Sequence, residues 1–374
     1  MYTELGTGET SRCQETPLLT ASHRSRATAK QHDSRRDASL DIAKGVAILL
    51  VVLGQSLSGL SAAGYFPTSF AWPFLSVYIL DLFQIPLLFV IAGHLTSRSH
   101  RPAGAVVARL VSGILYPYLL WSVLYGLALV SLSQYAHTPT SIASIYQILW
   151  IPINPYGFLY ALFFCHLGYL VIRRRSQPTQ LVIAAIVFLA PQFFLPAIAN
   201  AHLVIVLQTV RGFFYFVIGG ISVSQIRQFG RWMAITATVL FILFAIIYYQ
   251  SQLAGVIAAP AALPAGIAGV VATLAWSRML AERTGRLAGT IAAALAFCGR
   301  YWMGIFVIHI FFTTAARLAL QPLAFSSIMP AGIAAFVEIA VAVIAGVLGP
   351  LGINWIVSKF DLDKWFGLRP METN

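Results

Sequence analysis

The stretch DIAKGVAILLVVLGQSLS, from Asp41 to Ser58, is a strongly apolar run that is entered through Lys44 and carries Gln55 deep within it. At least eight further apolar runs follow it along the chain of 374 residues. Hydrophobic residues make up 59% of the chain, charged residues only 10%, and the mean hydropathy is +0.79, whereas soluble domains average roughly 25% charged residues. Because a backbone in lipid must satisfy its own hydrogen bonds, apolar runs of about 20 residues predict membrane-spanning helices. The sequence therefore predicts an all-α, polytopic membrane helix bundle.

The apolar runs can be placed individually by their length. We expect about ten spans, at Gly45–Tyr65, Phe74–His94, Val111–Ser131, Pro155–Ile172, Leu181–Ala199, Leu203–Val223, Trp232–Tyr249, Leu253–Trp276, Tyr301–Leu320 and Ala331–Ile353. A further apolar stretch, Leu287–Cys298, is too short to cross and predicts a re-entrant or interfacial helix.

The basic residues follow a regular pattern relative to these spans. The chain has 24 Lys and Arg against 12 Asp and Glu, but they do not form one stripe with aromatics, which argues against a nucleic-acid partner. They precede the first span and occupy every second connection, whereas 63–72 and 132–154 contain none. By the positive-inside rule, both termini are cytoplasmic. Residues 1–36, rich in Ser, Thr, Arg and Gln, predict a disordered basic cytoplasmic tail, and residues 37–374 an integral-membrane domain.

A few polar side chains fall inside the predicted spans, where an ionised group costs about 2.5–3.5 kcal/mol on insertion scales. Helix counting at about 1.5 Å per residue places Gln55 and Gln84 near mid-membrane, with Asp81 one turn further outward. Three more lie at central to outward depths, namely Arg211, His309 and Glu338. We expect these six side chains to line one cavity. No spacing of residues suggests a metal site.

Each of these groups has a structural alternative. Asp81 and Arg211 could form a buried ion pair between helices as well as take part in chemistry. Glu338 could pair with Arg211 or Arg317, or orient His309. A neutral imidazole is cheap to bury and titrates near neutrality, so His309 is the sharpest candidate base, the alternative being a histidine that only packs.

Six motifs resemble those of acyltransferase family 3, in the order in which that family carries them. They are LDIAKGVAILLVVLGQ (Leu40–Gln55), FQIPLLFVIAGHL (Phe83–Leu95), ARLVSGILYPYLLW (Ala108–Trp121), YGFLYALF (Tyr156–Phe163), RGFFYFVIGG (Arg211–Gly220) and FVIHIFF (Phe306–Phe312). The resemblance covers nearly the whole chain after the tail and is strongest to the fucose 4-O-acetylase-like branch. Lys44 stands at the basic position of the first-helix motif.

Two departures from the family pattern affect its chemistry. Gln55 stands where the family has its first-helix His, and Gln84 where many members have a second His. An amide cannot act as a base, but it can hydrogen-bond a hydroxyl or a thioester carbonyl.

The resemblance implies a membrane O-acetyltransferase that moves an acetyl group from acetyl-CoA to a sugar hydroxyl. The implied acceptor is a surface polysaccharide or exopolysaccharide, or its lipid-linked repeat unit, in a bacterial cytoplasmic (inner) membrane. Polysaccharide-assembly proteins are further expected partners, and no bound cofactor is expected. The alternatives are a catalytically degenerate member or a transporter that binds or moves a lipid-linked glycan or an acyl donor.

Roles for the polar residues follow from this implied activity. His309, Asp81 or Glu338 would take the hydroxyl proton while Gln55 positions the acyl group, and Gln84 and Arg211 would bind substrate. The phosphates of acetyl-CoA would bind at a basic cytoplasmic mouth made by Lys44, Arg98, Arg101 and Arg109. The paired N–H donors of an Arg guanidinium suit phosphate geometry.

The role of Lys44 can be tested directly. The Lys44→Ala variant should weaken the use of the acyl donor more than it changes membrane insertion, because the ammonium group would be lost from the donor's phosphates. The check is the apparent KM for acetyl-CoA at matched membrane abundance, and an unchanged value in the folded variant would contradict the role.

Overall fold

The computed structural model describes residues 17–66, 72–131, 143–194, 201–222, 230–253, 259–321 and 329–368. These residues form helices joined by short connections, and no strand occurs within the described ranges. The all-α prediction is therefore confirmed.

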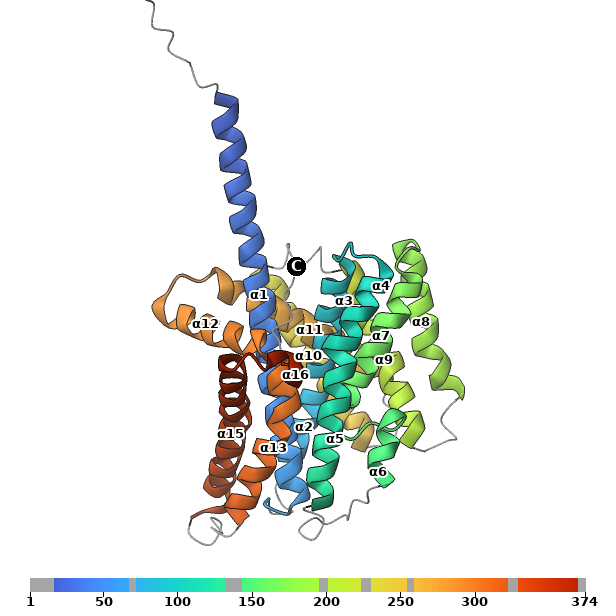
Figure 1. Ribbon diagram of the computed structural model, residues 1–374, viewed down its shortest axis with the longest axis vertical. Coiled ribbons are helices and arrows are strands. Elements are labelled where there is room, and N and C mark those ends of the chain that lie inside the picture. The colour runs from blue at the N-terminus through green and yellow to red at the C-terminus, as the bar shows by residue number, and fades with distance from the viewer. Residues whose placement is uncertain are drawn as a thin grey trace, which may run out of the picture.

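The helices form one bundle whose long axes run roughly side by side (Figure 1). Their bounds are α1 Pro17–Ala62, α2 Trp72–Asp81, α3 Gln84–Ser97, α4 Ala103–Leu110, the π-helical turn η1 Val111–Leu115, α5 Tyr116–Ser131, α6 Ala143–Tyr146, the 3₁₀ turn η3 Gln147–Leu149, α7 Gly157–Ile172, α8 Gln177–Phe194, α9 Ala201–Ser222, α10 Arg231–Leu253, α11 Ala259–Glu282, α12 Arg286–Arg300, α13 Trp302–Leu320, α15 Ala331–Lys359 and α16 Asp363–Phe366.

Eight helical stretches among the described residues are long and apolar enough to cross a membrane. Two of them combine elements, because α2 and α3 form the stretch Trp72–Ser97, and α4, η1 and α5 form Ala103–Ser131. Two shorter apolar helices, Gly157–Ile172 and Gln177–Pro191, stand where the fourth and fifth spans were expected. The chain is thus a polytopic membrane protein, and the count of ten stays a prediction.

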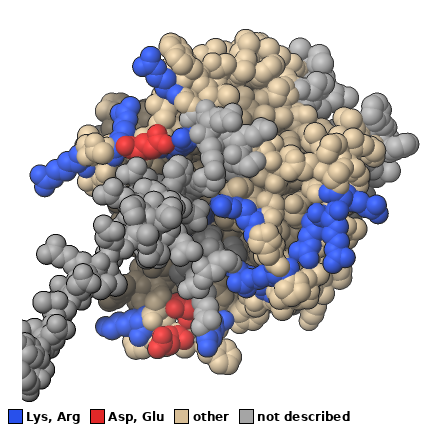
Figure 2. All heavy atoms as spheres, turned by 90° about the horizontal axis from the view of Figure 1, so that it is seen from above, with Lys and Arg blue, Asp and Glu red and all other residues tan. Residues whose placement is uncertain are grey.

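The two ends of the bundle differ in charge. The connections that follow α3, α7, α11 and α15 lie at the end from which the start of α1 projects, and Lys and Arg side chains are spread over this end, which Figure 2 shows from above. We call it the basic end, and the opposite end, which carries residues 63–66, the neutral end. The positive-inside rule predicts that the basic end is cytoplasmic.

The structure adds detail at two segments whose conformation was expected from the sequence. Helix α1 begins at Pro17, so it continues through much of the segment whose composition predicts a disordered tail, and residues 1–16 lie outside the described ranges. Proline suits the first turn of a helix, and the Ala, Arg and Lys that follow are good helix formers.

Leu287–Cys298 lies within α12, which runs across the bundle axis rather than along it (Figure 1) and leaves Leu287 and Ile291 exposed.

Glycines allow two pairs of helices to touch backbone to backbone. A Cβ atom added at Gly93 of α3 would lie 1.8 Å from the carbonyl oxygen of Phe216 in α9, and one added at Gly219 of α9 would lie 2.0 Å from that of Val90. The same holds where α1 crosses α12, at Gly45 and Gly299. Small residues permit such close approach between membrane helices, where dispersion contacts replace the hydrophobic effect as the main attraction.

Replacing Gly93 should therefore destabilise the bundle more than a typical glycine change. In Gly93→Ala the methyl group meets a carbonyl oxygen that cannot rotate away, so we expect a loss of about 3 kcal/mol or more, the upper range for overpacking. The measurement is the thermal unfolding midpoint in detergent micelles.

The matched control is Gly289→Ala in α12, whose Cβ would meet nothing within 4 Å. Alanine is favoured over glycine inside a helix by up to about 1 kcal/mol, so this variant should unfold at the same temperature or higher. Equal midpoints for the two variants would contradict the close contact.

Candidate functional site

A cavity of about 1200 Å³ lies among α1, α2, α3, α7, α8, α9, α10, α11, α13 and the connection that precedes α7. Its volume is above the roughly 300–1,000 Å³ of typical small-molecule sites. Exposed side chains at Ser58, Asp81 and Asn154 line it, and Ser58 lies one turn before the neutral end of α1. The cavity is therefore accessible from the neutral half of the bundle.

Four of the six expected polar residues line this cavity. They are Gln55 on α1, Asp81 at the end of α2, Gln84 at the start of α3 and Arg211 on α9. The other two, His309 and Glu338, do not line it. Helix depth was enough to group the four, but it could not tell which face of each helix turns inward.

Asp81 and Gln84 form a hydrogen-bonded pair on the cavity wall. Gln84 Nε2 donates to Asp81 Oδ1 at 2.8 Å, which fixes the orientation of the amide because a carboxylate oxygen accepts only from the NH₂ group. Gln84 is 3% exposed, and its Oε1 is buried without a hydrogen-bond partner among the described residues. An unpaired buried acceptor costs about 1–3 kcal/mol, so a donor that reached this oxygen would be bound favourably.

Arg211 presents a cation to the same cavity. Its side chain is exposed, and within the described residues its guanidinium forms no ion pair and no hydrogen bond. The ion pair that Asp81 and Arg211 could have made is thus absent, although both line the cavity. Gln208 and Tyr215, which are three residues before and four residues after Arg211, line it from the same face of α9.

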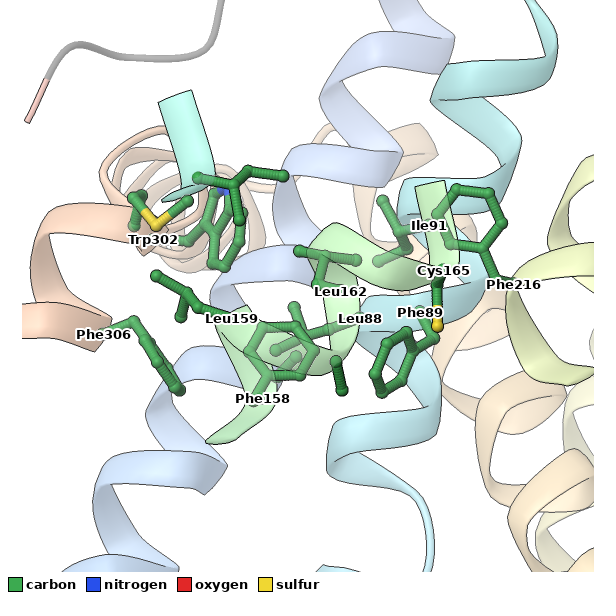
Figure 3. Packing of buried hydrophobic residues seen from close by; sticks show 14 of the residues in the cluster. Leu88, Phe89, Ile91, Phe158, Leu159, Leu162, Cys165, Phe216, Trp302 and Phe306 are labelled. Carbon is green, nitrogen blue, oxygen red and sulfur yellow. The ribbon is translucent and has the colours of Figure 1, made fainter. Parts of the chain in front are cut away.

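Aromatic side chains close the cavity toward the basic end. Phe89, Phe158 and Phe306 line it from α3, α7 and α13, with ring centroids 5.1 Å apart for Phe89 and Phe158 and 5.3 Å apart for Phe158 and Phe306. Figure 3 shows Phe158 between the other two, with Leu162 and Trp302 above them in this view. Leu162 is 1% exposed, so the layer is closely packed. We call these three phenylalanines, with Trp302, the aromatic layer.

His309 lies on the face of α13 that packs against α15. Its Nδ1 donates to the carbonyl oxygen of Phe306 at 2.7 Å, and a Cβ added at Gly346 of α15 would lie 4.0 Å from the Cβ of His309. The ring is fully buried, and Nε2 has no partner among the described residues. The backbone bond makes Nε2 the acceptor, but in this conformation it does not reach the cavity.

Glu338 is also buried away from the cavity, at 4% exposure, with Oε2 unpartnered among the described residues. No ion pair joins it to Arg211 or Arg317 in the part of the chain described. Arg317 instead donates from Nη1 to the carbonyl oxygen of Gly59 at 3.2 Å. The sequence-based pairing partners of Glu338 are therefore not in contact with it.

The expected basic mouth is divided. Lys44 is 7% exposed and pairs with Asp41 at 2.5 Å, beside the crossing of α1 and α12. Arg101 instead lines a separate hollow of about 300 Å³ together with His100, Arg173 and Arg174. Arg98 and Arg109 lie nearby in the chain, at the end of α3 and within α4, but do not line that hollow.

Sequence reasoning missed several polar residues of the cavity, namely Ser58, Tyr78, Asn154, Gln208 and Tyr248. Spacing could have found Tyr78 and Gln208, because each lies three residues before a selected residue and so shares its helix face. Tyr248 required the structure, since its ring packs against that of Tyr78 with centroids 5.5 Å apart across two helices distant in sequence.

A polar cavity among membrane-spanning helices is typical of integral-membrane enzymes and transporters. Residues 37–355 match the family profile of an acyltransferase domain, Acyl_transf_3. The chain belongs to this acyltransferase family, which confirms the resemblance seen in its motifs. Neither curated proteins nor solved structures provide a match.

The seal made by the aromatic layer can be tested with Cys165, which is fully buried one turn beyond the cavity-lining Ala161 of α7. In a Cys13→Ser/Cys298→Ser background, a membrane-impermeant maleimide added at the neutral end should leave Cys165 unlabelled. Phe89→Ala removes a ring that lies beside Cys165 (Figure 3) and should raise labelling at least tenfold.

The positive control is Ser58→Cys, because Ser58 is exposed in the cavity. Rapid labelling of Cys165 in the otherwise unaltered background would contradict the seal.

Proposed function

We propose that the protein is a membrane O-acetyltransferase that transfers an acetyl group from acetyl-CoA to a sugar hydroxyl of a surface polysaccharide or its lipid-linked repeat unit. Membership of the acyltransferase family supports acyl transfer. The observation that carries the choice of acceptor is the pair formed by Asp81 and Gln84 on the cavity wall, in which the exposed Asp81 carboxylate keeps further acceptor capacity for ligand hydroxyls. Adjacent hydroxyls of a sugar ring suit such a pair.

The chemistry requires a base and donors that stabilise an oxyanion. In our proposal, Asp81 takes the proton of the acceptor hydroxyl, and the hydroxyl oxygen attacks the thioester carbonyl carbon. The amide of Gln55 lies on the same cavity and would stabilise the negative charge of the tetrahedral intermediate, while Arg211 would bind substrate. The C–S bond then breaks, the acetyl ester forms, and the CoA thiolate receives the proton that left the hydroxyl.

Asp81 is preferred to His309 and Glu338 as the base because it is exposed to the cavity while both alternatives are buried elsewhere. For the donor we propose entry from the basic end, where the hollow beside Arg101 and Arg173 suits phosphate groups. The pantetheine arm would then pass through the aromatic layer, so this route requires Phe158 or a neighbouring ring to move.

The test is the acetyl ester content of the surface polysaccharide, measured by NMR in cells that lack the protein and are complemented with variants at equal membrane abundance. We expect loss in the deletion, rescue by the unaltered chain, and a fall of about 10²-fold or more in initial acetylation rate with Asp81→Asn, because an amide cannot accept the proton.

The matched control is Glu282→Gln, the same change at an exposed carboxylate that pairs with Arg278 at the basic end and contributes about 0–1 kcal/mol. It should acetylate normally. If His309→Ala abolishes acetylation and Asp81→Asn does not, the base is His309. If the deletion leaves the ester content unchanged and no second acetyltransferase is present, the proposed function is wrong.

A further inference from the structure

The distribution of cations in the bundle singles out Arg211. The other Lys and Arg of the described residues lie at or near the basic end, except Arg317, which is engaged with the carbonyl oxygen of Gly59. Arg211 alone among these cations lines the cavity that opens toward the neutral half. A guanidinium at this depth is costly, so one that lines a cavity without an ion pair among the described residues is suited to bind an anionic ligand.

Its surroundings do not neutralise it. Asp81 is the carboxylate that lines the same cavity, and no ion pair within 4.0 Å joins it to Arg211. The Asp81 carboxylate is instead held by Gln84 at 2.8 Å. The two charges are thus kept apart on different helices, and each can act on a different part of one ligand.

We infer that the acceptor of the proposed acetyl transfer is acidic, and that Arg211 binds its carboxylate or phosphate group while Asp81 and Gln84 bind its hydroxyls. The identification of this ligand as the acceptor rests on the proposed function, whereas the anion-binding site itself does not. A planar guanidinium offers paired donors that match either anion. Gln84, which lines the cavity, keeps Oε1 more than nine-tenths buried and without a partner among the described residues, so a ligand hydroxyl that displaced its packing would satisfy it.

The size and remaining lining of the cavity agree with a ligand of this kind. About 1200 Å³ leaves room for more than the group at Arg211. Tyr78 and Tyr248 offer adjacent aromatic faces, with ring centroids 5.5 Å apart, against which the C–H face of a sugar ring can pack. The anion could be a uronic acid carboxylate of the acceptor or the phosphate of a lipid-linked sugar.

Binding to the full chain in lipid nanodiscs tests the inference with three probes, namely methyl β-glucuronide, methyl β-glucoside and glucose 1-phosphate. The first two differ by a carboxylate in place of a hydroxymethyl group. A charged hydrogen bond predicts at least about tenfold tighter binding of one or both anions than of the glucoside. Preference for the glucuronide alone assigns a carboxylate, and preference for the phosphate alone assigns a phosphate.

The variant Arg211→Gln should remove this preference, and Arg211→Lys should restore part of it. Arg231→Gln, which removes an exposed cation at the start of α10, should leave it unchanged. Equal affinity for the three probes in the unaltered chain, or a preference that survives Arg211→Gln, would overturn the inference.

Release of free thiol from acetyl-CoA, measured in the same nanodiscs, separates this inference from the proposed function. Ester formation on the glucoside with the same kcat/KM as on the glucuronide and the phosphate would overturn the acidic acceptor and leave acetyl transfer standing. Anion preference that depends on Arg211, without thiol release on any probe, would support the anion site and count against acetyl transfer.

Discussion

The backbone contact between α3 and α9 is the constraint on which the cavity depends. Gly93 and Gly219 let the two helices approach so closely that a Cβ at either position would lie within 2.0 Å of a carbonyl oxygen on the other helix. Phe89 of α3 also packs its ring over Gly212 of α9. This parallel contact sets the relative position of Gln84, at the start of α3, and Arg211, at the middle of α9, which line one cavity. The site is therefore built on rigid helices rather than on loops.

The polar groups inside the bundle fall into two sets. Gln55, Asp81, Gln84 and Arg211 face the cavity, whereas His309 and Glu338 are buried between other helices and keep unpartnered atoms. The first set has the accessibility that substrate chemistry needs, and it contains a carboxylate, two amides and a cation. The second set is buried and has no access to the cavity. A direct catalytic role for His309 or Glu338 would therefore require movement of α13 or α15.

The membrane class, the helical fold and most helix positions could be predicted from the sequence, because length and hydropathy decide whether a segment is stable across a bilayer. Leu287–Cys298 was also separated from the spans by its length alone, and it lies in the crosswise helix α12. The disordered tail over residues 1–36 stays a prediction: its polar composition indicates disorder, whereas α1 begins at Pro17 and its Ala, Arg and Lys favour a helix. The family was evident from six motifs in order and is shown by the match over residues 37–355.

The sequence by itself determined which segments enter the membrane, which end carries the basic residues, and which polar groups lie at mid-depth, since these depend on transfer free energy and position along the chain. Only the tertiary structure decided which of those groups share a cavity, because that depends on how each helix is rotated about its axis by packing. Thus Gln55 and His309, though both polar and near mid-membrane, point to different neighbours. The rotation is set by contacts such as those at Gly93 and Gly219, between residues more than a hundred positions apart.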